Sequence, residues 1–123
     1  FAYHNHDFEL QELGGKIPYD ILLKDTDADL VKMELDLYWA TKAGYDAVKM
    51  FNENPGRYPL WHVKDMDTSG AFAPVGTGTI DFKRIFKARK KAGVKHFFVE
   101  QDRIAGDVKS AISTSYKSVE QLL

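Results

Sequence analysis

Metal-binding and proton-transferring side chains recur along the 123-residue chain at the ends of short apolar stretches. In chain order they are His4 and His6, then Glu34 and Asp36, then His62, Lys64 and Asp65, and finally Glu100 and Asp102. Charged groups at the end of an apolar strand are costly to bury unless they are paired or bound to a metal. Imidazole and carboxylate together form a mixed nitrogen and oxygen ligand set, which suits Mn, Co, Zn, Fe or Ni better than Ca. These residue types therefore predict a divalent-metal site with acid–base groups beside it.

The elements that must position these side chains alternate between strand and helix patterns. We expect strands over 1–6, 31–40, 58–67 and 94–102, and helices over 18–24, 43–56, 81–93 and 107–123. This alternation predicts right-handed crossovers and a parallel sheet, in which the carboxyl ends of the strands meet at one face. We predict that the four strand-end residues that meet there are the metal ligands, namely His4, Asp36, His62 and Glu100.

The spacing of the four predicted ligands fits four βα units. From each ligand to the next the separations are 32, 26 and 38 positions, and a (β/α)8 barrel has a mean repeat of ~31 residues. A doubly wound open sheet has units of similar length, so spacing alone leaves both architectures open. No GxGxxG motif follows a strand, and we interpret Gly76-Thr77-Gly78 as a plain turn.

Several of these residues also have a purely structural interpretation. Asp36 could cap a helix, and His62, taken without its HVKD context, would more often be a structural histidine. We interpret His96 as structural or solvent-facing, because it lies near the start of its strand. The basic run over 83–91 is most simply the solvated face of a helix.

Composition narrows the class of protein. A net charge of −1 gives no indication of a nucleic-acid or anionic-membrane partner, and the absence of cysteine excludes disulfides and thiolate metal sites. We find neither a signal peptide nor an apolar run near the ~18 residues of a membrane span. A cytoplasmic location is therefore expected, with a periplasmic one as the alternative if a signal lies upstream. Because the chain opens on Phe1 inside a predicted strand, we expect the natural chain to start earlier.

Five segments resemble a known family in their order and spacing. They are YHNHDFEL, MELDLYWATKAG, PGRYPLWHVKD, PVGTGTIDFKRIF and FFVEQD. Together they resemble the C-terminal half of the xylose isomerase-like sugar phosphate isomerase/epimerase superfamily, over essentially the whole chain. The resemblance implies an α/β fold in which residues 1–123 form one partial TIM-barrel domain, comprising strands five to eight with their helices.

The resemblance also implies one divalent metal, usually Mn²⁺ or a similar ion such as Zn²⁺, Co²⁺ or Mg²⁺. Asp36, His62 and Glu100 match the ligands of strands six, seven and eight. His4 occupies the position where the family usually has a strand-five glutamate, and Trp39 occupies the position of a common histidine. These departures bring the chain closer to the branch that includes inosose dehydratase-like and keto-sugar-processing members.

The predicted activity is a metal-dependent isomerisation or epimerisation of a sugar phosphate or keto-sugar, by proton abstraction next to a carbonyl. Glu100 is the first choice for acid–base work, with His4 or His6 opposite it, and Lys64 would steady the developing oxyanion. Trp39 and Asn5 are the predicted substrate contacts, with Trp39 as an apolar wall for the sugar.

Three alternatives stay open at this point. The first is an inosose dehydratase-like enzyme or a keto-glycoside lyase or hydratase on the same fold. The second is an endonuclease IV-like phosphodiesterase, which would need several zinc ions and a basic surface. The third is an inactive fragment, because four βα units leave two unpaired sheet edges. Such a chain is expected to pair with its N-terminal half or to self-associate.

Overall fold

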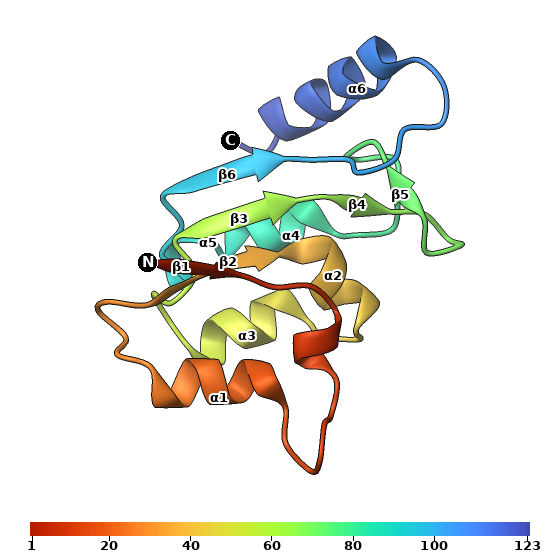
Figure 1. Cartoon of the computed structure of the whole chain (residues 1–123). Coiled ribbons are helices and arrows are strands. Elements are labelled where there is room, and N and C mark those ends of the chain that lie inside the picture. Colours follow the sequence, from red (N-terminus) through yellow and green to blue (C-terminus); the bar gives the residue numbers. More distant parts are fainter.

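The computed structural model describes residues 1–123 and arranges them as strands alternating with helices (Figure 1). The main sheet contains β1 (Ala2–His4), β2 (Lys32–Asp36), β3 (Leu60–Val63) and β6 (His96–Val99), in that order and all parallel. Its register aligns His4 with Glu34 and Asp36 with His62. The carboxyl ends of all the strands therefore meet at one edge, as the sequence predicts.

The helices follow the strands as the βα pattern requires. They are η1 (Phe8–Leu10), α1 (Pro18–Asp25), α2 (Leu37–Lys42), α3 (Ala47–Glu53), α4 (Phe82–Lys87), α5 (Arg89–Ala92) and α6 (Val108–Glu120). In Figure 1, α1 and α3 lie below β1 and β2, whereas α6 lies beyond β6. No helix combines the length and the apolar character that a membrane crossing needs.

The largest local error of the sequence prediction lies in the segment 31–40. The strand ends at Asp36, and the residues that follow it form α2. Asp36 causes this early end, because its Oδ1 accepts hydrogen bonds from the backbone N–H groups of Tyr38 and Trp39 and so caps the new helix. The helix expected over 43–56 is shorter, since only α3 lies within it, and Gly44 at φ +85° separates α2 from α3.

The other element boundaries shift by less. The strand expected over 58–67 divides into β3 and the short β4 (Asp65–Met66), which pairs antiparallel with β5 (Phe72–Ala73) inside the expected loop. The helix over 81–93 divides into α4 and α5, but Asp81 caps its start and Gly93 ends it in a left-handed conformation, as expected.

The two faces of the sheet differ in character. Met33, Leu35 and Trp61 point toward the helices and are fully buried. Trp61 stacks on Phe51, with ring centroids 5.1 Å apart, so this tryptophan belongs to the core. The other face carries the predicted ligands together with the apolar Leu60 and Phe98, because successive strand residues point to opposite faces.

Asp65 organises the loop that returns from the sheet to α4. Its side chain is buried and accepts hydrogen bonds from the backbone N–H groups of Met66, Gly76, Gly78 and Ile80 at 2.8–3.3 Å. A Cβ atom at Gly78 would collide with this carboxylate. The Gly-Thr-Gly segment, predicted to be a plain turn, is thus a turn fastened to a buried acid.

We expect Asp65→Asn to lower the free energy of unfolding by about 2–3 kcal/mol. The buried carboxylate accepts from backbone N–H groups through both oxygens, whereas the asparagine amide would place its own N–H groups against some of those donors. Urea denaturation followed by circular dichroism measures this loss. Asp29→Asn, an exposed acid whose carboxylate accepts none of the hydrogen bonds of the structure, is the matched control. Equal denaturation midpoints for the two variants would contradict the role of Asp65.

Candidate metal centre

Three of the predicted ligands converge at the carboxyl ends of β1, β2 and β3. His4 Nε2 lies 3.1 Å from Asp36 Oδ2, and the rings of His4 and His62 stack with centroids 4.0 Å apart. One ligand atom from each of His4, Asp36 and His62 lies within 4.8 Å of the others. This His–Asp–His group could hold a metal ion, because its members bring two imidazoles and a fully buried carboxylate to one point.

Three acids surround the ring of His62. Its Nε2 lies 2.8 Å from Glu34 Oε1, while its Nδ1 lies 2.7 Å from Glu100 Oε2 and 3.8 Å from Asp36 Oδ2. The distance to Glu100 is short, yet the buried Nδ1 has no hydrogen bond of acceptable geometry. With the proton on Nε2 and donated to Glu34, Nδ1 presents a free lone pair toward the cluster, which is the arrangement of a histidine held for metal binding.

Lys64 brings a positive charge into the middle of the acids. Its Nζ lies 3.1 Å from Asp36 Oδ2, 3.0 Å from Glu100 Oε2 and 3.1 Å from Asp102 Oδ1, and its side chain is almost fully buried. Burial alone lowers the pKa of Lys64, but Asp36, Glu100 and Asp102 outweigh burial and raise it above the usual 10.5. The ammonium group therefore stays charged at neutral pH.

The remaining predicted residues lie outside the His–Asp–His group. Glu100 stands outside the His–Asp–His group but touches it through His62. His6 is exposed, and its ring lies 5.0 Å from that of His4 and 5.5 Å from that of Trp39. His96 is exposed, which fits its expected structural or solvent-facing position.

Asn5 is fully buried and uses both polar ends of its side chain within the protein. Its Oδ1 accepts from the backbone N–H of Asp36, and its Nδ2 donates to the carbonyl of His6. The bond to Asp36 ties the end of β1 to the end of β2 at a predicted ligand. Contact between Asn5 and a substrate stays a prediction, and in this geometry the residue acts as a support.

Two acids that shape this centre were expected at strand ends, but the sequence assigned them neither a ligand nor a catalytic role. Glu34 orients His62, and Asp102 binds Lys64 through both carboxylate oxygens, at 3.1 and 3.3 Å. The signal for Glu34 was present, because it lies two positions before Asp36 and so shares its face of the strand. Asp102 follows β6, and its contact with Lys64 arises only from packing.

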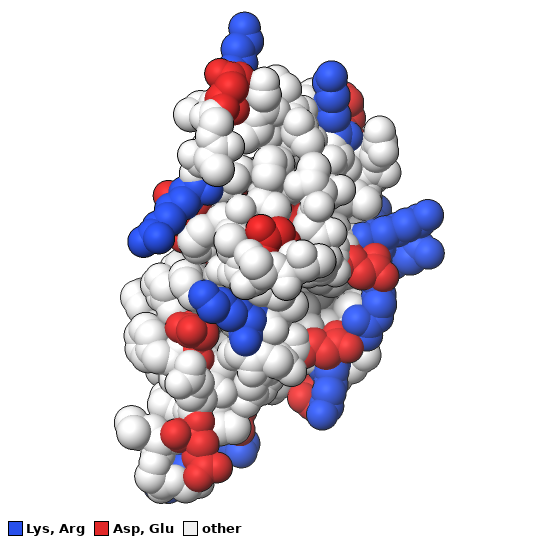
Figure 2. All heavy atoms as spheres, turned by 90° about the vertical axis from the view of Figure 1, so that its right-hand side faces the viewer, with Lys and Arg blue, Asp and Glu red and all other residues white.

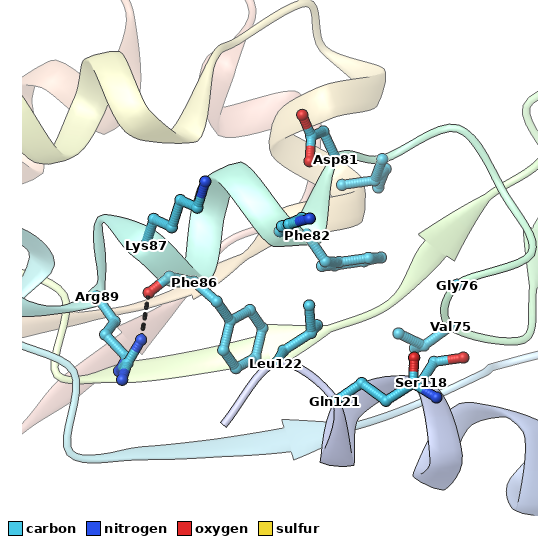
Figure 3. Close-up of a pocket in the computed structure, with 12 residues that line it drawn as sticks. Val75, Gly76, Asp81, Phe82, Phe86, Lys87, Arg89, Ser118, Gln121 and Leu122 are labelled. Carbon is cyan, nitrogen blue, oxygen red and sulfur yellow. Dashed lines mark hydrogen bonds between the residues drawn. The ribbon is translucent and has the colours of Figure 1, made fainter.

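Two cavities differ in their relation to this centre. One of about 540 Å³ lies between α4 and the end of α6, away from the histidines, with Phe82, Phe86 and Leu122 in its wall (Figure 3). Another of about 530 Å³ lies beside α2 and the β4–β5 hairpin and includes Asp102 and Trp39. Figure 2 looks onto the edge where the strands end, and acidic and basic side chains are interspersed around this face.

Comparison with known proteins gives no match to a family model or to a curated protein. Several solved structures do match, and two of them are sugar phosphate isomerase/epimerases from Parabacteroides distasonis ATCC 8503. The first is 28% identical with a TM-score of 0.76 over 98% of this chain, and the second is 31% identical with a TM-score of 0.73 over 97%. The predicted resemblance to the sugar phosphate isomerase/epimerases is confirmed.

This chain spans 44% and 43% of the lengths of those two isomerase/epimerase structures. The match in fold over almost the whole chain, together with the parallel four-stranded sheet, confirms the predicted half-barrel architecture. The open doubly wound sheet, which spacing alone had left as an alternative, is thereby set aside.

Replacing Lys64 by Met is expected to lower the free energy of unfolding by about 2 kcal/mol at neutral pH, since Asp36 would remain buried without its cation. The loss stays below that of a fully enclosed pair because water reaches Glu100 and Asp102, whose side chains are 39% and 42% exposed. Urea denaturation measures it, with the exposed Lys49→Met as the control.

The pH dependence of this difference has a definite sign. Folding raises the pKa of Lys64, so its stabilisation is complete below about 10.5 and is lost only as the pH rises beyond that value. The deficit of the Lys64→Met variant should therefore be constant across neutral pH and shrink only above about 10.5. A deficit that already shrinks between about pH 7 and 9 would contradict this account.

Proposed function

We propose that this chain carries the metal site of an enzyme that isomerises or epimerises a sugar phosphate or keto-sugar by moving a proton next to a carbonyl. The observation that carries the proposal is the convergence of His4, Asp36 and His62 with an acid, Glu100, and a buried cation, Lys64, at one strand-end face. Active sites of barrels of this class lie at that face. Similarity to two sugar phosphate isomerase/epimerases supports the class of substrate.

His4, Asp36 and His62 would hold the ion, and Glu100 is close enough to His62 to join them. Mn²⁺ is the first choice, with Zn²⁺, Co²⁺ and Mg²⁺ as alternatives for a mixed nitrogen and oxygen site. A divalent ion bound there would supply Lewis-acid polarisation of a substrate carbonyl. Glu34 would keep the Nδ1 lone pair of His62 available through its contact with Nε2.

Side chains of this chain would carry out the proton transfer. Glu100 is partly exposed and so can reach the substrate, where its carboxylate would take the proton from the carbon beside the carbonyl. The C–H electron pair would move onto the carbonyl oxygen, and the Lys64 ammonium would stabilise that oxyanion. His6, whose ring is exposed, would return the proton more freely than His4, which is engaged by Asp36.

The fate of the proton would decide the reaction. Returning it to the neighbouring carbon gives isomerisation, and returning it to the other face of the same carbon gives epimerisation. Expulsion of a β-hydroxyl from the same enediolate would give the dehydratase or lyase alternative. The single His–Asp–His group offers less support for an endonuclease IV-like enzyme, which needs several metal ions.

We also propose that a complementary half-barrel covers the open edges of the sheet. β1 and β6 each have a neighbouring strand on one side only, and Phe98 and Val99 of β6 are 49% and 42% exposed. Free parallel edges with apolar side chains favour pairing with further strands. Such pairing, with another chain or another copy of this one, would also enclose the polar face that carries the metal site.

The metal site is tested by titrating the chain with Mn²⁺ in a calorimeter. We expect one site per chain, with affinity about 100-fold lower in Asp36→Asn and His62→Gln and about tenfold lower in Glu34→Gln. Asparagine is chosen at position 36 because it retains the helix cap while removing the charge. His96→Gln is the control, and wild-type affinity in the Asp36 and His62 variants would rule out this site.

The substrate class is tested by repeating the Mn²⁺ titration in the presence of D-fructose, a keto-sugar. If the sugar binds beside the ion, linkage requires each ligand to raise the affinity for the other, and we expect an increase of about fivefold. D-sorbitol, which has no carbonyl group, is the control and should give a smaller effect. Equal effects of the two compounds would contradict a carbonyl-directed site.

A further inference from the structure

A second recognition surface adjoins the metal centre. The cavity of about 530 Å³ beside α2 is formed by three segments that follow different strands, and we call it the aromatic pocket. Its lining comprises Tyr38, Trp39 and Lys42 of α2, residues 70–72 of the β4–β5 hairpin, and residues 102, 103 and 105 of the loop after β6. It contacts the centre at two points, because Asp102 binds Lys64 and the ring of Trp39 lies 5.5 Å from that of His6.

Aromatic rings form one wall of the pocket. Tyr38 stacks on Phe72 with ring centroids 4.3 Å apart, and Trp39 meets both rings edge-on, at 4.9 and 5.9 Å. The hydroxyl of Tyr38 donates to the carbonyl of Gly70, which holds the hairpin against α2. The wall is therefore a braced surface of a size and polarity suited to one face of a sugar ring.

The polar groups of the pocket lack anionic partners. Lys42 lies over the rings of Trp39 and Tyr38, at 4.8 and 5.4 Å, and neither Lys42 nor Arg103 takes part in any ion pair of the structure. Asp102 is the acid of the pocket, and both its oxygens are engaged by Lys64. The indole Nε1 of Trp39 is buried without a hydrogen-bond partner. The unmatched donors and charges are thus all of the kind that binds an anion.

We propose that the aromatic pocket binds an anionic oxygen group, a phosphate or a carboxylate, at the end of the sugar away from the metal centre. Arg103 would provide paired N–H donors and Lys42 a point charge, while the aromatic wall carries the ring. The inference rests on the proposed function and names its substrate class more closely. Neutral sugars of the same size lack the charge that Lys42 and Arg103 require.

The test is calorimetric binding of D-glucose 6-phosphate, D-glucuronate and D-glucose to the chain in buffer containing EDTA. We expect one or both anionic sugars to bind at least about tenfold more tightly than glucose, as one charge-assisted hydrogen bond provides. Preference for the first identifies phosphate, and preference for the second identifies carboxylate. Equal affinity for all three sugars, or no binding of either anionic sugar, would overturn the proposal.

A double variant, Lys42→Met with Arg103→Met, is expected to lose this preference, so that the anionic sugars bind no more tightly than glucose. Lys49→Met with Lys90→Met removes the same amount of positive charge from exposed positions outside the pocket and should keep the preference. Retained preference in the first double variant would also overturn the proposal.

Mn²⁺ titration of the same proteins separates this proposal from the metal site. The Lys42/Arg103 variant should bind Mn²⁺ as the wild type does, because neither residue belongs to the His–Asp–His group. A chain that binds anionic sugars without binding Mn²⁺ would refute the proposed metal site alone. A chain that binds Mn²⁺ but shows no preference for anionic sugars would refute the aromatic pocket alone.

Discussion

The burial of the Asp36 carboxylate is the constraint on which the rest of the strand-end face depends. A buried charge is tolerated only when its oxygens are fully engaged, and Asp36 meets this condition with two sets of partners. Oδ1 accepts the first N–H groups of α2, while Oδ2 receives His4 and Lys64. One side chain therefore joins the end of β2, the start of α2 and the candidate metal centre.

This arrangement couples the centre to the aromatic pocket. Because α2 begins on Asp36, the orientation of that carboxylate sets the position of Tyr38 and Trp39 on the first turn of the helix. Asn5 strengthens the link by accepting from the backbone N–H of Asp36. A change in the contacts of Asp36 would thus shift Tyr38 and Trp39, which are proposed to bind the far end of a sugar.

Lys64 gives the centre its electrostatic balance. Four carboxylates gather around it or around His62, and a single ammonium cannot neutralise them. The surplus negative charge favours the binding of a further cation. When no such cation is bound, Lys64 limits the repulsion among the acids. In the proposed reaction the same ammonium would stabilise the developing oxyanion, so one residue would serve both the stability of the face and the chemistry.

What the sequence determined by itself was the alternation of strands and helices and the set of chemically capable residues at the strand ends. Alternating burial along a strand is a local pattern, which is why 32–36 and 60–63 were recognisable as strands, and why Glu34 and Asp36 were expected on one face. The resemblance of five segments to the sugar phosphate isomerase/epimerases was also legible without coordinates, and the match to two solved structures confirmed it.

Only the tertiary structure decided how those residues are used. An aspartate at a strand end suits a metal and a helix cap equally well, and the packing of α2 shows that Asp36 serves as a cap while it also faces the histidines. The buried support by Asn5 and the ion pairs of Lys64 with three acids depend on contacts between residues 28 to 38 positions apart in the sequence. Sequence patterns report the burial of each residue along its own element, whereas the meeting of distant side chains is set by how those elements pack.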